Sequence, residues 1–252
     1  MKRLNNHPAP RGGTAVAHNH PRMPFIISIH RPAPCMPALP YRVRWYIIFI
    51  RLPHFPENSM ILDQLVSEWH AAGIEPGDTI LIHTSLKRTF TRYAEQGHTL
   101  TPQLILDSFR QALGPEGTLL LPLFNFDFTK GVPFDMRTTP SQMGALTEAG
   151  RLTPGAVRTG HPIYSFAVLG RQAEVFRGVD NFSGYGADSP FAMLRQMDAK
   201  IAALNLYDQN SMTFYHHVEE MHNAPYRFHK RFTAPYTGAE GTTEPRTYGL
   251  FV

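Results

Sequence analysis

A histidine in a short turn between glycine and proline is the first feature of the sequence that could do chemistry. His161 follows Gly160, precedes Pro162 and stands ahead of the apolar run Phe166-Ala-Val-Leu169. Glycine and proline predict a turn, and the apolar run predicts a buried strand. A neutral imidazole held in such a turn can take a proton from an attacking amine near neutral pH. The alternative is a turn histidine that bonds only to backbone groups.

A second pair of polar residues has helical spacing. Residues 213–223 are expected to form a helix with three apolar residues on its buried stripe: Phe214, Val218 and Met221. His216 and Glu219 would lie together on another face of that helix. A carboxylate beside an imidazole can orient the ring, and it can also hold a cationic amine. The alternative is a solvated helix face, and Glu220 competes with Glu219 for either role.

Strands and helices are expected to alternate around these residues. Apolar runs predict four buried strands, at 79–82, 118–122, 166–169 and 201–204. Helical spacing predicts three further helices, over 61–72, 103–113 and 141–148, with Gly73 ending the first and Thr101 capping the second. This alternation predicts an α/β domain in which flanking helices cover a layered sheet.

The ends of the strands are the expected place for a cofactor, because ligands of layered α/β domains favour the crevice beyond the carboxyl ends of the strands. His83, Thr84 and Ser85 follow the first predicted strand directly. Ser211 and Thr213 are expected to cap the helix that follows, and a helix N-terminus favours an anion or a developing oxyanion. The alternative for each of these residues is plain strand termination or capping.

Residues 1–59 differ in composition from the rest of the chain. They hold ten of the 22 prolines, five of the 13 histidines and eight of the 24 Lys and Arg residues, but only one of the 20 acids. We expect an irregular or disordered extension there, upstream of a functional start at Met60 and not part of the native protein. Residues 60–252 keep 16 basic and 19 acidic residues, a net charge of −3. The basic balance therefore belongs to the extension, which argues against a nucleic-acid partner.

The cysteine content and the hydropathy of the sequence bear on the cellular location of the protein. The single cysteine, Cys35, excludes an intrachain disulfide and fits a reducing, cytoplasmic location. The best apolar run, residues 45–50, is far shorter than the roughly 20 residues that a membrane span needs. The chain ends inside the strand-like run 247–252, so we expect it to be shorter than its natural form.

Six segments, in this order, resemble the motifs of the aminoglycoside 3-N-acetyltransferase family, whose fold is not that of the GNAT acetyltransferases. They are residues 75–86, 113–122, 134–146, 158–166, 186–190 and 213–219. Each segment is a weak match alone, but the order and spacing of all six make the resemblance strong. The resemblance covers about residues 60–252.

The resemblance implies an acetyl-CoA-dependent enzyme that acetylates the 3-amino group of an aminoglycoside. It makes His161 the expected general base, with Glu219 orienting that base or holding the substrate and His216 beside it. Residues 83–85, Ser211 and Thr213 would hold acetyl-CoA. Because Cys35 lies outside the patterned region, direct transfer is expected instead of an acetyl-cysteine intermediate. The stretch around Asp208 is one or two residues longer than the family pattern, which leaves the role of Asp208 open.

Other functions stay open at this point. The acceptor could be a biosynthetic amino sugar of polysaccharide assembly, or the chain could be a degenerate homologue that binds CoA without turnover. A zinc site of His216, His217, Glu220 and His222 is disfavoured because no HExxH motif or Cys/His framework is present, so no metal is expected. No membrane partner is expected either, and the sequence does not indicate an oligomeric state.

Overall fold

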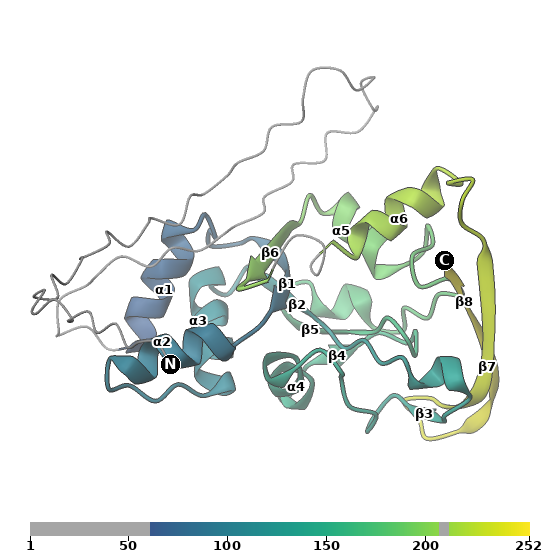
Figure 1. Ribbon diagram of the computed structural model, residues 1–252, viewed down its shortest axis with the longest axis horizontal. Coiled ribbons are helices and arrows are strands. Elements are labelled where there is room, and N and C mark those ends of the chain that lie inside the picture. The colour runs from purple at the N-terminus through teal and green to yellow at the C-terminus, as the bar shows by residue number, and fades with distance from the viewer. Residues whose placement is uncertain (1–60, 207–211) are drawn as a thin grey trace, which may run out of the picture.

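The computed structural model describes residues 61–206 and 212–252, so the extension 1–59, Met60 and Ser211 lie outside the described part. Figure 1 shows the five-stranded sheet, named sheet A, in the middle, with helices at one end and the three-stranded sheet, named sheet B, at the other. The helices are α1 (Ile61–Ala71), α2 (Lys87–Glu95), α3 (Pro102–Leu113), α4 (Ala145–Leu152), α5 (Pro190–Gln196) and α6 (Phe214–Met221). Two short 3-10 helices, η1 (Asp127–Lys130) and η2 (Ala173–Phe176), lie in the loops. The domain is of the mixed α/β class, as the alternation of elements predicted.

Sheet A has the strand order β4-β5-β2-β1-β6. Its strands are β1 (Thr79–Thr84), β2 (Thr118–Pro122), β4 (Val157–Arg158), β5 (Phe166–Gly170) and β6 (Lys200–Leu204). β1 pairs in parallel with β2 and β6, whereas β5 is antiparallel to β2 and to β4. The carboxyl ends of β1, β2 and β6 therefore meet the amino end of β5 at one edge of the sheet.

Sheet B has the order β3-β7-β8, with β3 (Phe134–Asp135), β7 (His229–Thr237) and β8 (Thr243–Phe251). β7 and β8 form a long antiparallel hairpin in which Pro235 faces Pro245. Proline has no backbone N–H to donate, and the two strands exchange no hydrogen bond at this pair of residues, so the hairpin tolerates both prolines.

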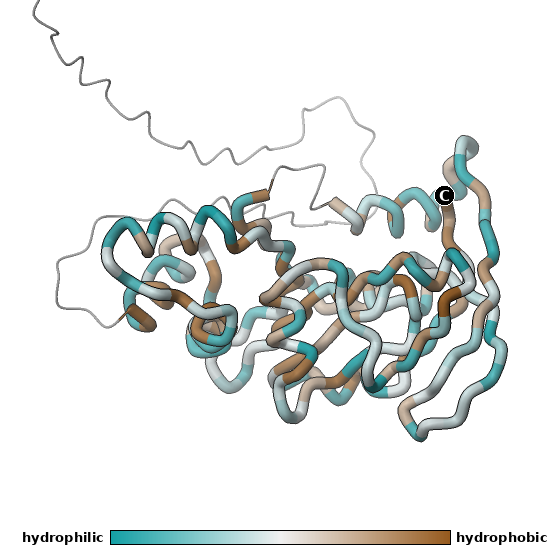
Figure 2. Tube along the Cα trace, turned by 60° about the horizontal axis from the view of Figure 1, so that its bottom comes forward, coloured by the Kyte–Doolittle hydropathy of each residue, from teal (hydrophilic) through white to brown (hydrophobic). Residues whose placement is uncertain are grey.

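Each face of sheet A contributes to a separate apolar core. Ile80 and Ile82 of β1 join the core beneath α1 and α3, whereas Leu81 joins the core that includes sheet B, α5 and α6. Because side chains alternate along a strand, His83 lies on the same face as Leu81. Figure 2 shows the helices alternating between hydrophilic and hydrophobic residues along the tube, as helices that cover a core do.

The predicted strands and helices are confirmed, with boundaries within two residues of the expected ones in all but one helix. Thr101 caps α3 by accepting a hydrogen bond from the backbone N–H of Leu104 at 3.1 Å, as expected. The helix expected over 141–148 begins instead at Ala145, because Gly144 has a φ of 117° and breaks the helical path. No helix within the described ranges is long and apolar enough to cross a membrane.

A buried carboxylate ties α1 to α2. Glu68 is fully buried, and its oxygens accept hydrogen bonds from Arg92 Nη2 at 3.1 Å and from the Tyr93 hydroxyl at 3.2 Å. Burial raises the pKa of Glu68 to about 7, against the charge of Arg92, which lowers it. The packing of these two helices is therefore sensitive to pH.

Replacing Glu68 by glutamine is expected to flatten the pH dependence of stability. The folded-state pKa is about 7 and the ordinary value is 4.5, so the folded protein binds more protons between these values. This contribution to stability is complete below the ordinary pKa and is lost as the pH rises through the folded one. In urea unfolding, the wild type should lose about 1–3 kcal/mol between about pH 5 and about pH 8. An equal loss in E68Q would contradict this account.

Candidate active site

Backbone pairing extends beyond the strands at the edge where β1, β2 and β6 end. The N–H of Ser85 donates to the carbonyl of Leu204 at 2.9 Å, and the N–H of Asn125 donates to the carbonyl of Ile163 at 3.1 Å. The side chain of Asn205, whose φ is 57°, donates to the Ser85 carbonyl at 3.0 Å. These bonds hold the segment after β1 against the segment after β6.

A continuous series of aromatic contacts runs from this edge to α6. Ring centroids are 6.3 Å apart for His83 and Phe124, 4.5 Å for Phe124 and Tyr164, and 4.7 Å for Tyr164 and Tyr185. The ring of His216 on α6 lies 5.1 Å from that of Tyr185. The fold therefore brings the end of β1 and the polar face of α6 to the two ends of one aromatic cluster.

His216 and Glu219 form a hydrogen-bonded pair on α6. His216 Nδ1 lies 2.7 Å from Glu219 Oε2, and the two side chains are 32% and 22% exposed. A carboxylate oxygen accepts, so Nδ1 carries the hydrogen and the neutral ring keeps its lone pair on Nε2. An imidazole oriented in this way by a carboxylate can act as a base through Nε2.

Two neighbours hold Glu219 in its ionised form. The Tyr226 hydroxyl donates to Oε1 at 2.9 Å, and Arg227 Nε lies 2.8 Å from Oε2 as an ion pair without hydrogen-bond alignment. Burial acts to raise the pKa of Glu219, but the bonds from His216 and Tyr226 and the charge of Arg227 outweigh it, so the pKa lies below its ordinary value. The carboxylate is charged at neutral pH and can stabilise an imidazolium on His216.

His161 has no exposed surface, and both of its ring nitrogens are engaged by the backbone. Its Nδ1 accepts from the N–H groups of Ile163 at 3.2 Å and Tyr164 at 3.0 Å, and its Nε2 lies 3.3 Å from the carbonyl of Gly249. A carbonyl accepts, so the hydrogen sits on Nε2 and the lone pair is used at Nδ1. Burial lowers the pKa of His161 to about 4, which keeps the ring neutral.

This arrangement differs from the one expected for a base at His161. Nε2 carries a hydrogen that points to the Gly249 carbonyl, and the lone pair of Nδ1 is occupied by two donors. Within the described residues Glu219 bonds to His216, and no hydrogen bond or ion pair joins it to His161. The geometry is that of the alternative, a turn histidine bonded to backbone, which fastens the turn to β8.

The residues expected to hold a cofactor are in different situations. Thr84 and Ser85 are half-buried at the edge, and His83 is buried. Thr213 precedes α6 in a helical conformation and makes no side-chain cap, so the prediction that it caps the helix is wrong. An N-cap residue usually has an extended backbone, whereas the backbone of Thr213 is helical. Its carbonyl accepts a hydrogen bond from the N–H of His216. Ser211 lies outside the described residues.

The buried stripe of α6 is more polar than predicted. Phe214 is buried as expected, but the stripe continues through His217 and Glu220, while Val218 and Met221 are only half-buried. Partners for His217 Nδ1 and for both Glu220 oxygens offset part of the cost of burial, although His217 Nε2 has no hydrogen-bond partner. His217 Nδ1 donates to the carbonyl of Tyr185 at 2.7 Å, and the two oxygens of Glu220 bond to Ser183 at 2.7 Å and His229 at 3.1 Å.

These bonds also bear on the zinc alternative. Glu220 and His217 face different partners, and the described residues contain no group of three or more His, Cys, Asp or Glu side chains placed to hold a metal ion.

Tyr164, Tyr185 and Tyr226 are part of the contacts around the candidate residues, although no sequence pattern pointed to them. Tyr185 separates Tyr164 from His216, and Tyr226 reaches Glu219 after the turn that follows α6. The only sequence signal was the aromatic type itself, because their roles depend on contacts that the chain makes after folding.

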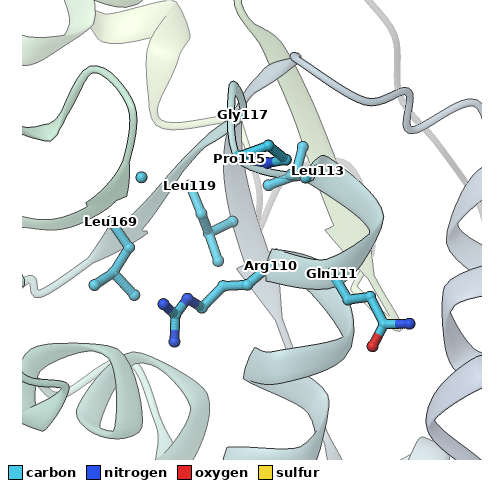
Figure 3. Close-up of a pocket in the computed structure, with 9 residues that line it drawn as sticks. Arg110, Gln111, Leu113, Pro115, Gly117, Leu119 and Leu169 are labelled. Carbon is cyan, nitrogen blue, oxygen red and sulfur yellow. The ribbon is translucent and has the colours of Figure 1, made fainter.

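A cavity of about 480 Å³ lies at the opposite edge of sheet A (Figure 3). Arg110 and Gln111 of α3 border it, and Leu113, Leu119 and Leu169 form its apolar wall. None of the residues that line it is a histidine or a carboxylate that could move a proton, so the candidate active site is the one at the edge near His216.

Removing the imidazole of His161 is expected to destabilise the fold. His161→Ala leaves the N–H groups of Ile163 and Tyr164 without their acceptor, and the free energy of unfolding should fall by about 2–4 kcal/mol. His161→Asn, whose Oδ1 can accept from the same two groups, should recover about half of that loss. Thermal and urea unfolding measure both variants, and an H161A variant as stable as the wild type would contradict the structural role.

Comparisons with known proteins agree with this architecture. A family model described as aminoglycoside 3-N-acetyltransferase matches residues 81–251. Aminoglycoside N(3)-acetyltransferase IV of Salmonella sp is 29% identical over 167 residues, which is 65% of this chain and 60% of the relative. Aminoglycoside N(3)-acetyltransferase VIII of Streptomyces fradiae is 28% identical over 194 residues, which is 68% of this chain and 63% of the relative.

Among solved structures, one described as AAC-IIIb binary with CoASH is similar with a TM-score of 0.66 and 27% identity, covering 76% of this chain and 75% of that chain. The chain spans about 60% of the length of the two curated relatives. The family model covers well over half of the chain, in the region that carries sheet A, α6 and sheet B. The chain therefore belongs to the aminoglycoside 3-N-acetyltransferase family.

Proposed function

We propose that the protein transfers an acetyl group from acetyl-CoA to an amino group of an aminoglycoside, the 3-amino group in the first place. Membership of the family and the names of the curated relatives support the acceptor class, and the similar structure with bound CoASH supports the donor. The observation that carries the proposal is the partly exposed pair of His216 and Glu219, 2.7 Å apart, at one end of the aromatic cluster that reaches the edge where β1, β2 and β6 end.

The pair is suited to amine acetylation. The amine nitrogen attacks the thioester carbon, a C–N bond forms, and the nitrogen must lose a proton as it does so. His216 Nε2 takes this proton while the Glu219 carboxylate stabilises the resulting imidazolium. When the intermediate collapses, the C–S bond breaks and the same proton can pass from His216 to the departing thiolate of CoA. No metal is needed for this sequence.

This proposal gives the base role to His216, whereas the family motif put His161 first. His161 would instead position the turn that carries Tyr164, which contacts the aromatic cluster of the site. The acyl donor would lie at the strand ends, close to Thr84 and Ser85, with the start of α6 at Thr213 on its other side. Direct transfer suits this site, because a histidine and not a cysteine is at its centre.

Acetyl transfer is tested by the release of the CoA thiol from acetyl-CoA. We expect release with aminoglycosides that carry a free 3-amine and none with analogues in which that amine is blocked. His216→Ala should lower kcat by about 10²–10⁴-fold, the usual worth of a positioned base, and Glu219→Gln by a smaller factor. His222→Ala removes an exposed histidine just past the end of the same helix and should keep full activity.

Three results would change the proposal. Loss of turnover in a folded H161N variant, with H216A still active, would return the base role to His161. Release only with amino-sugar nucleotides would indicate a biosynthetic acceptor. Binding of CoA without release for any acceptor, measured by calorimetry, would indicate a degenerate homologue.

A further inference from the structure

His83 breaks the pattern of the strand that carries it. β1 is the only strand of sheet A, within the described residues, that has a parallel neighbour on both sides, and Ile80, Leu81 and Ile82 are fully buried. His83 continues this strand and is only 5% exposed. Packing alone would favour another apolar side chain there, because an imidazole must give up hydration on burial. A residue that breaks a local rule of this kind is a place to look for function.

The ring of His83 lacks the partner that burial normally requires. Its Nε2 is shielded from solvent and has no hydrogen-bond partner. The buried ring of His161 is different, because both of its nitrogens bond to the backbone. A polar atom buried without a partner is costly and calls for an explanation outside the packing of the free protein.

The position of His83 supplies such an explanation. It lies at the carboxyl end of β1, between β2 and β6, on the face of the sheet that it shares with Leu81. Its ring contacts Phe124, the first ring of the cluster that ends at His216. An acyl group attacked by an amine beside His216 would therefore lie on the same side of the sheet as His83.

The chemistry of the ring fits a donor of one hydrogen bond. Burial lowers the pKa of His83 to about 4, so the imidazole is neutral near neutral pH. A neutral imidazole with its hydrogen on Nε2 can donate to a carbonyl oxygen without bringing a net charge into an apolar site. Donors aimed at an oxygen that gains negative charge in the reaction accelerate acyl transfer strongly.

We propose that His83 Nε2–H donates a hydrogen bond to the carbonyl oxygen of the acyl thioester and to the oxyanion that forms from it. The inference rests on the proposed acetyl transfer. As the C–N bond forms, the π electrons of the carbonyl move to this oxygen. They return when the C–S bond breaks, and the proton of the amine goes to His216. His83 neither gains nor loses a proton in this sequence.

The first test measures stability, which does not depend on turnover. His83→Met removes the buried donor and keeps a similar volume with an apolar side chain. The midpoint of thermal unfolding of the ligand-free protein should stay the same or rise, because a polar atom without a partner has been removed. His161→Met is the matched control and should lower the midpoint, since bonded nitrogens are lost there. A clear fall in H83M would show that His83 is needed for packing and would overturn the proposal.

The second test measures the donor itself. H83M should lower kcat by about 10²–10³-fold, as loss of one oxyanion donor does, and change the KM for acetyl-CoA little. His83→Gln places an amide N–H at a similar reach and should keep kcat within about tenfold of the wild type. Turnover of H83M within threefold of the wild type, or equal losses in H83M and H83Q, would overturn the role of His83 and leave the proposed function standing.

Binding separates the two proposals if turnover is absent. Isothermal titration should show tighter binding of acetyl-CoA than of CoA, and H83M should remove this preference without changing the affinity for CoA. A preference that persists in H83M would overturn the role of His83. Failure of the wild type both to bind acetyl-CoA and to turn it over would overturn the proposed function and this inference together.

Discussion

The parallel pairing of β1 with β2 and β6 is the constraint on which the rest of the site depends. It brings the carboxyl ends of three strands to one edge of sheet A, where backbone groups and polar side chains leave the apolar core. The antiparallel β5 adds the segment from His161 to Ser165 at the same edge, through bonds to the residues that follow β2. On α6, the ring of His216 is connected to this edge through the ring contacts of Tyr185, Tyr164 and Phe124.

Hydrogen-bond partners give three imidazoles of the same region three different properties. His161 has backbone partners at both nitrogens and is fixed as a neutral structural group. His216, the proposed base, has a carboxylate at Nδ1 and a partly exposed ring. His83 is buried and its Nε2 has no hydrogen-bond partner, as we propose for a donor whose partner is the bound ligand. Residue type alone does not distinguish these cases, because the properties come from the neighbours.

Local patterns predicted the parts of the molecule that depend on local interactions. The four buried runs of sheet A, and the cap of α3 by Thr101, follow from residues close in sequence. The contact between His216 and Glu219 was also predictable, because residues three apart on a helix are neighbours. The polar helix α2 was not recognised, because only Thr89 and Tyr93 on it are buried and its apolar stripe is weak.

Features that depend on distant contacts were not predictable in the same way. The burial of His161 results from β8, since Gly249 is 88 residues further along the chain. Local sequence correctly predicts a turn at this histidine, but it cannot show that β8 buries the turn. The partner of Glu219 at Tyr226 is nearer in sequence, yet it depends on how the chain folds back after α6. β7 was missed because its largely exposed residues form no continuous apolar run.

The tautomers of the histidine rings test the central claim most directly. Nitrogen-15 NMR of histidine-labelled protein, assigned by comparison with the H161N and H216A variants, reports which ring nitrogen carries the hydrogen. We expect hydrogen on Nδ1 for His216 and on Nε2 for His161, with His161 neutral throughout the neutral pH range. Hydrogen on Nδ1 of His161, together with titration of that ring near neutral pH, would contradict the assignment of the base to His216.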